Sequence, residues 1–118
     1  MGDGSRLAGM QRYASVVRLK PEHREEYLRI HREVWPSVEA MIVRANIRNY
    51  SIFLHGDLLF AYLEYVGDDY EADMAAMAAD PETQRWWKIT DPMQESLTEG
   101  RWWTPVPEVY HIDGPSAG

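Results

Sequence analysis

The sequence predicts an α+β fold, with helices packed on an antiparallel sheet. Residues 12–19 and 47–54 alternate their side chains with the two-residue period of half-buried strands. The turn His55-Gly56-Asp57 leads into a returning apolar strand at residues 58–66, so these two strands are expected to form a hairpin. Helical signals lie between the strands and after the hairpin. The resulting element order is β-α-β-β-α-β.

The first strand and the first helix form the amino-terminal half of this pattern. In the strand, alternate residues share one side: Tyr13, Ser15, Val17 and Leu19. Pro21 stands where the helix should begin, and the glutamates after it suit the positive end of the helix dipole. One stripe of side chains follows this helix: Tyr27, Ile30, His31, Val34 and Val38. Pro36 removes a backbone hydrogen bond and crowds the preceding turn, so a kink or a restart of the helix is expected there.

The second half begins with the hairpin. Its first strand should turn three side chains to one face: Tyr50, Ile52 and Leu54. The alanine-rich stretch 72–79 has strong helix propensity, and Asp80-Pro81 ends this helix and starts another that runs through Trp86-Trp87. After Thr90 the chain is irregular and rich in proline, until residues 108–113 offer a short last strand.

This order is that of the ferredoxin-like βαββαβ sandwich, a four-stranded antiparallel sheet with helices on one face. The other face of such a sheet needs a cover. Apolar side chains occupy adjacent positions in residues 59–63, so both faces of this strand are expected to be partly buried. A homodimer that packs sheet against sheet is predicted, and the alternative is a monomer with one semi-polar face.

The composition limits what the chain can do. Its 118 residues suit one domain, expected at residues 10–113 between a flexible leader, residues 1–9, and a flexible tail, residues 114–118. The chain has no cysteine, which excludes disulfides, thiolate nucleophiles and iron–sulfur clusters. A formal net charge of −7 argues against nucleic acid and anionic membranes as partners. The longest apolar run, residues 58–63, is far below the ~20 residues of a membrane span, so a cytoplasmic protein is expected.

Five residues are candidates for a functional site. Tyr27 and His31 stand four residues apart and share one helix face, where an imidazole with an ordinary pKa near ~6.5 suits acid–base work on a neutral polyol. Read alone, a helical histidine is more often structural, and a strand tyrosine such as Tyr50 more often packs. Trp86 and Trp87 point about 100° apart on a helix, so one indole can enter the core while the other stacks on a sugar. The alternative that both indoles only fill the core has equal weight.

Other motifs are missing or open to two interpretations. The sequence has no His-x-x-x-His pair, no Asp-x-Asp cluster and no Gly-rich phosphate loop, so neither a metal site nor a cofactor is predicted. Trp102-Trp103 lie in the irregular segment, where a lid or a dimer contact is as fitting as a ligand contact.

Six separated motifs, in order and over most of residues 11–113, resemble the L-rhamnose mutarotase family. They are Tyr27-x-x-x-His31, Val34-Trp35-Pro36, Asn49-Tyr50-Ser51-Ile52, Leu58-Leu59-Phe60-Ala61, Gln84-Arg85-Trp86-Trp87 and Pro107-Glu108-Val109. The resemblance implies a small dimeric ferredoxin-like protein that interconverts the α and β anomers of a 6-deoxy sugar without a cofactor. It also implies a small neutral monosaccharide as the partner.

Carried over by position, the family's proton donor falls on His31. The family's sugar contacts fall on Tyr27, Tyr50, Trp86 and Trp87. Ring opening then needs one proton delivered and one removed, and His31 is expected to supply or relay one of them. Alanine in place of either tryptophan is expected to weaken sugar binding more than it disturbs the fold. Residues 89–105 depart from the family pattern, which leaves L-fucose or another hexose as an alternative to L-rhamnose.

Two other classes remain open at this point. Cofactor-free monooxygenases and lactone isomerases of the dimeric α/β barrel type also place histidine and aromatic residues in a cleft. A non-catalytic dimeric ligand-binding module would use the same aromatic residues for its core and its interface.

Overall fold

A computed structural model describes residues 10–115 of the protein, and its centre is an antiparallel sheet. The sheet has three long strands, β1 (Gln11–Leu19), β2 (Ile47–His55) and β3 (Leu58–Tyr65), and two short ones, β4 (Gln94–Glu95) and β5 (Thr104–Val106). The order is β2-β3-β1-β4, and β5 pairs with β1 beside β4. The predicted first strand and the predicted hairpin are therefore confirmed.

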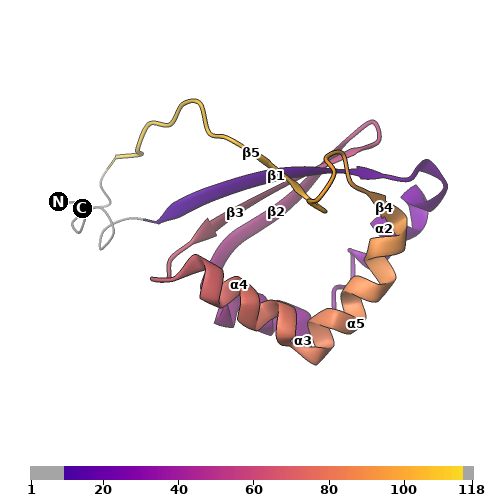
Figure 1. The fold of residues 1–118 in the computed structure, drawn as a ribbon, viewed down its shortest axis with the longest axis horizontal. Helices are drawn as coiled ribbons and strands as arrows, with labels where there is room; N and C mark the ends of the chain where they lie inside the picture. Colours follow the sequence, from indigo (N-terminus) through magenta and orange to yellow (C-terminus); the bar gives the residue numbers. More distant parts are fainter. Residues whose placement is uncertain (1–9, 116–118) are drawn as a thin grey trace.

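The helices lie on one side of this sheet (Figure 1). They are α2 (Arg24–Ile30), α3 (Pro36–Arg44), α4 (Tyr70–Ala79) and α5 (Pro81–Thr90), with 3-10 turns η1 (Pro21–His23) and η2 (Asp91–Met93). The outer face of the sheet carries no helix of the described part of the chain. This arrangement confirms the predicted α+β class with helices on one face.

The first predicted helix is interrupted, and Pro36 is the reason that it restarts. Helix α2 ends at Ile30 with His31 as its C-cap, and Pro36 is the first residue of α3. A proline ring excludes the backbone hydrogen bond of a continuous helix and disfavours helical geometry at the residue before it. Trp35 accordingly has an extended backbone, with φ −62° and ψ 133°. The break places His31 at a helix end rather than within a helix.

The predicted last strand at residues 108–113 is wrong. The carboxy-terminal strand is β5, and no strand forms among residues 107–115. The physical reason is register: Val106 lies opposite Ala14, so continued pairing would exhaust β1 at Gln11 after three more residues. Pro107 also lacks the N–H that a ladder needs. The predicted leader, residues 1–9, and the last three residues of the predicted tail lie outside the described residues.

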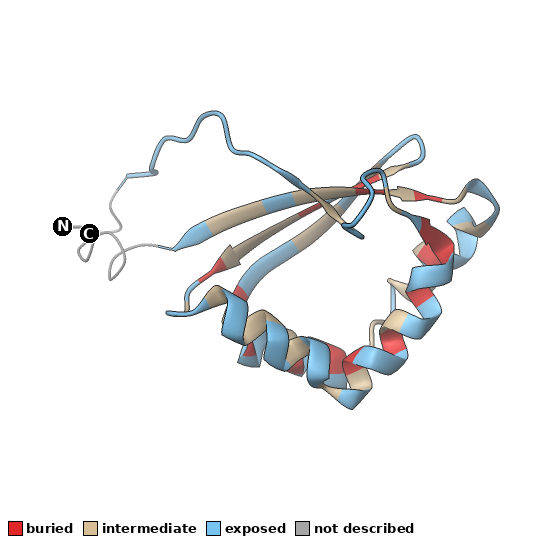
Figure 2. Ribbon diagram, in the orientation of Figure 1, coloured by how far each residue is buried: buried red, intermediate tan, exposed pale blue. Residues whose placement is uncertain are grey.

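The core lies between the sheet and the helices, where Figure 2 shows most of the buried positions. One cluster contains Val17, Leu19, Tyr27, Leu59 and Met93, and a second contains Met41, Ala45 and Ile47. The predicted alternation of the first strand is thus confirmed at Val17 and Leu19.

A β-bulge in β2 decides which of its side chains face the helices. The register with β3 shifts between Arg48 and Ser51, and Asn49 takes a positive φ of 50°. One extra residue reverses the alternation, so Ile47 before the bulge and Tyr50 after it line the same cavity. The predicted common face of Tyr50 and Ile52 is confirmed, because both line that cavity.

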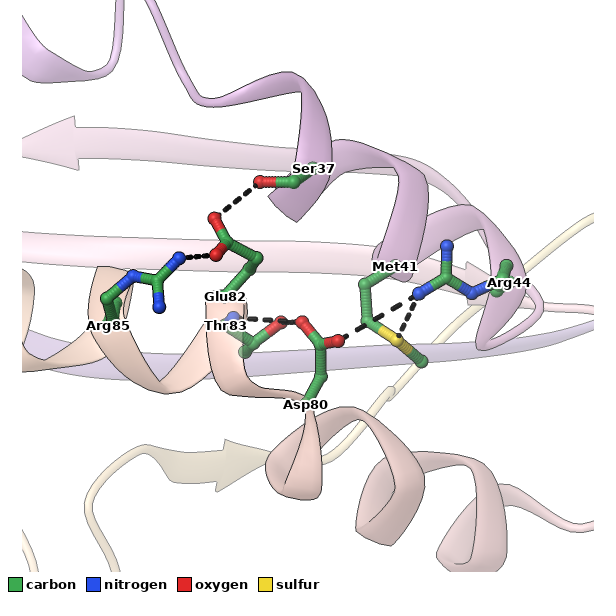
Figure 3. Close-up of polar contacts among 7 residues, drawn as sticks. All are labelled: Ser37, Met41, Arg44, Asp80, Glu82, Thr83 and Arg85. Atoms are coloured by element: carbon green, nitrogen blue, oxygen red, sulfur yellow. Dashed lines mark hydrogen bonds and ion pairs between the residues drawn. The ribbon is translucent and has the colours of Figure 1, made fainter.

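Polar contacts tie the start of α5 to α3 (Figure 3). Asp80 caps α5 and accepts hydrogen bonds of 2.9 Å from both the backbone N–H and the hydroxyl of Thr83. Ser37 Oγ on α3 donates to Glu82 Oε1 at 3.0 Å, and the Arg44 guanidinium lies 4.0 Å from Asp80. The hydrogen bonds to the ionised carboxylate lower the pKa of Asp80. These contacts fix the helix that carries the tryptophan pair.

Candidate active site

A cavity of about 750 Å³ lies between the helices and the inner face of the sheet. This volume falls within the usual range of small-molecule sites, roughly 300–1,000 Å³. Its wall is mostly apolar, with a few hydroxyl, amide, imidazole and carboxyl groups. All five residues singled out in the sequence line this cavity: Tyr27, His31, Tyr50, Trp86 and Trp87.

Tyr27 and His31 form the centre of the site. Their rings stack with centroids 4.1 Å apart and planes inclined by 28°. His31 Nδ1 lies 2.8 Å from the backbone carbonyl oxygen of Tyr27. A carbonyl oxygen only accepts, so this contact assigns the ring hydrogen to Nδ1 and leaves the lone pair on Nε2. The same carbonyl also accepts a 3.3 Å hydrogen bond from the backbone N–H of His31.

The electrostatic setting keeps the imidazole neutral. His31 is half-buried, and this burial lowers its pKa below the ordinary 6.5, while the hydrogen bond to the Tyr27 carbonyl acts in the opposite direction. At neutral pH the ring therefore presents an unprotonated Nε2, which can take a proton. His31 is neither sealed in the core nor distant from the indoles.

The two adjacent tryptophans differ in burial, because neighbouring helical side chains point in different directions. Trp86 is buried, and its ring meets His31 edge-on at 5.4 Å and Trp35 edge-on at 5.2 Å between centroids. Trp87 is half-buried. Trp86 therefore packs against the imidazole. Trp87 lines the cavity, where a bound ligand can displace water from its indole ring.

Tyr27 and Tyr50 both line the cavity. Burial raises the pKa of Tyr27 well above its ordinary value, and the neighbouring Tyr50 hydroxyl adds to this shift. Tyr50 is 42 % exposed as a whole residue, but its hydroxyl end is desolvated, which raises the pKa of this phenol to about 12. Both phenols stay protonated at neutral pH and can act as hydrogen-bond donors.

The sequence did not single out Gln94, and it left the role of Trp102 open. Trp102 Nε1 donates to Gln94 Oε1 at 2.7 Å, and Gln94 Nε2 donates to the Tyr27 hydroxyl at 3.4 Å. Gln94 is 4 % exposed and lies in the segment predicted to be irregular. A glutamine in such a segment is normally solvated, so no local signal marks it. Asp91 also lines the cavity, and burial raises its pKa.

Residues 10–115 lack two other kinds of feature. No group of three or more histidine, cysteine, aspartate or glutamate side chains there could hold a metal ion. No helix in that range is long and apolar enough to cross a membrane.

Comparison with known proteins identifies the family. Residues 12–112 match the family model described as L-rhamnose mutarotase. The L-rhamnose mutarotase of Phocaeicola vulgatus is 33% identical over 107 residues, which are 88% of this chain and 100% of the relative. That of Opitutus terrae is 36% identical over 110 residues, again 88% of this chain and 100% of the relative.

Solved structures share the fold. The L-rhamnose mutarotase of Formosa agariphila superposes with a TM-score of 0.71 at 21% identity, over 87% of this chain and 99% of that one. Tetracenomycin F2 cyclase of Streptomyces glaucescens gives 0.68 at 16% identity, over 89% of this chain and 99% of that one. At these identities the likeness concerns the fold alone. By its family-model match and its relatives, the chain belongs to the L-rhamnose mutarotase family and is an isomerase of that type.

Proposed function

We propose that this isomerase interconverts the α and β pyranose anomers of L-rhamnose, with His31 as its acid–base group. One observation carries the proposal: the His31 imidazole, with Nδ1 bonded to the Tyr27 carbonyl, lines a largely apolar cavity that also contains tyrosine hydroxyls and tryptophan indoles. The relatives that share the family are named for L-rhamnose, which supports this sugar as the substrate.

The reaction needs only proton movements. The anomeric hydroxyl at C1 loses a proton, the ring oxygen gains one, the C1–O5 bond breaks, and rotation of the aldehyde precedes closure on its other face. Nothing is oxidised, and the reverse transfers restore the protein. His31 Nε2 accepts and returns one proton, while a tyrosine hydroxyl or a water molecule moves the other. Acid–base assistance of this kind contributes ~10²–10⁴-fold.

Saturation-transfer NMR of the two anomeric protons tests this function directly. The protein should accelerate exchange between the anomers of L-rhamnose over the spontaneous rate. L-Fucose, D-glucose and D-galactose under the same conditions report the specificity. Sugar binding without accelerated exchange would contradict the proposal.

The acid limb of the pH profile should follow His31. Protonation of Nε2 removes the acceptor, so the catalysed rate should fall with decreasing pH. Because burial lowers the pKa of His31, the midpoint should lie below 6.5. Exchange rates from pH 8 to pH 4, corrected for the spontaneous reaction, check this. The Asp91→Asn and Glu39→Gln variants should keep the limb, which separates His31 from these two carboxyl groups of the same cavity. A midpoint above 6.5 would contradict the assigned environment.

We also propose that the protein is a homodimer that packs through the outer face of its sheet. Phe53 and Phe60 lie opposite each other in the hairpin and are 60 % and 38 % exposed. Phe60 alternates with the buried residues Leu59 and Ala61, so this pair points away from the helices. Exposed aromatic residues on a face that no helix covers favour burial against a second copy.

Replacing Phe60 by Asp should convert this dimer to a monomer, because a carboxylate would be desolvated in the interface. Sedimentation velocity measures the outcome. Val43 on α3, which is 54 % exposed on the helical side, supplies the matched control Val43→Asp, which should stay dimeric. A monomeric parent protein would refute the proposed assembly.

A further inference from the structure

We infer that Gln94 and Trp102 are positioning residues that aim the hydroxyl hydrogen of Tyr27 into the cavity. The inference deepens the proposed function, on which its catalytic part rests. It concerns the segment after Thr90, in which the sequence left the role of Trp102 open.

The orientation of the Gln94 amide follows from one contact. Trp102 Nε1 lies 2.7 Å from Gln94 Oε1, and an indole N–H can only donate. The atom facing Trp102 is therefore the amide oxygen, and the amide nitrogen must face Tyr27. Its distance to the Tyr27 hydroxyl oxygen is 3.4 Å.

The orientation of the Tyr27 hydroxyl follows in turn. An amide NH₂ group only donates, so the Tyr27 oxygen accepts from Gln94 and its own hydrogen must point elsewhere. Tyr27 is 3 % exposed, so bulk water does not compete for this hydrogen, and Tyr27 lines the cavity where the sugar would lie. We therefore assign the hydrogen to that cavity. A sugar oxygen bound there would then accept a hydrogen bond from the Tyr27 hydroxyl instead of facing its lone pair.

The backbone holds Gln94 in place. Gln94 pairs with Leu19 of β1 in the sheet. The carbonyl of the preceding residue, Met93, accepts a 2.8 Å hydrogen bond from the Lys20 backbone N–H. The chain then leads to Trp102, and β5 returns immediately afterwards to pair with β1. Both ends of the segment are thus anchored on the same strand, which brings the indole to the amide.

Two variants of Gln94 with side chains of similar size distinguish a role in orienting the Tyr27 hydroxyl from a role in packing. Gln94→Glu keeps an acceptor for Trp102, but its second oxygen accepts the hydrogen of Tyr27 and turns it away from the cavity. Gln94→Met has neither donor nor acceptor, so the Tyr27 hydroxyl becomes free to rotate. The catalysed exchange rate at saturating sugar should fall in the order parent, Met, Glu, with a loss of about tenfold or more for Glu. The apparent KM should change less than kcat, because the misdirected proton acts on the transition state.

The matched control is Gln84→Glu. Gln84 lies on the exposed side of α5 and bonds the Ala78 carbonyl, so the same chemical change there should leave exchange unaltered. The indole N–H signal of Trp102 gives a readout independent of activity. It should keep its hydrogen-bonded shift and slow solvent exchange in Gln94→Glu and lose both in Gln94→Met.

The outcomes divide cleanly. The inference is supported if kcat falls in the order parent, Gln94→Met, Gln94→Glu and the Trp102 indole signal moves only in Gln94→Met. Equal kcat in the parent and Gln94→Glu, or equal losses in the two variants, overturns it. An indole signal unmoved in Gln94→Met overturns it whatever the activity. Absence of exchange in the parent protein itself would instead refute the proposed function.

Discussion

His31→Ala should lower the catalysed anomer exchange by at least about 100-fold while the protein remains folded. The change removes the Nε2 atom that accepts a proton in the cavity. It also removes the ring that stacks on Tyr27 at 4.1 Å and meets Trp86 edge-on. The residual rate should approach the spontaneous one, because His31 is the one imidazole among residues 10–115 that lines the cavity. Saturation-transfer NMR at neutral pH measures the loss.

His31→Gln is the control for packing. A glutamine amide can still donate to the Tyr27 carbonyl and fill part of the space, but it cannot accept a proton at neutral pH. It should therefore be as inactive as His31→Ala and melt closer to the parent temperature. Full activity in either variant would remove His31 from the mechanism, and another group would have to move the proton.

Trp86→Ala should be the most destabilising of the site substitutions, and Trp87→Ala the more informative one for binding. The burial of Trp86 changes the expectation that both truncations act mainly on the sugar. Trp86 is 7 % exposed and packs against both His31 and Trp35, so its removal leaves a void and should cost about 3–5 kcal/mol of the free energy of unfolding. Chemical denaturation measures this loss.

Trp87→Ala should preserve most of the stability, because this side chain is only half-buried. The variant loses one aromatic wall, and a ring contact of about 0.5–1.5 kcal/mol corresponds to a roughly 2- to 13-fold weaker affinity for the sugar. Titration calorimetry with L-rhamnose gives this number. Unchanged affinity in Trp87→Ala would show that the indole does not stack on the sugar.

Local signals predicted the elements whose causes act within a few residues. The two-residue alternation of β1, the turn at Gly56 and the proline restart at Pro36 each depend on neighbouring side chains or on one backbone position. The same holds for the Tyr27 and His31 pair, because positions four apart on a helix must meet. The last strand was misplaced because its pairing depends on how much of β1 remains free, which is a property of register.

The sequence alone therefore determined the α+β class, the family motifs and the list of aromatic and histidine candidates. Only the tertiary structure decided which nitrogen of His31 is free, which indole is buried and which residue holds Tyr27. The bulge at Asn49 turns Tyr50 to the cavity, and Gln94 reaches Tyr27 across 67 residues of sequence. Such contacts depend on strand register and on the packing of distant segments, and periodicity along the chain carries no information about either.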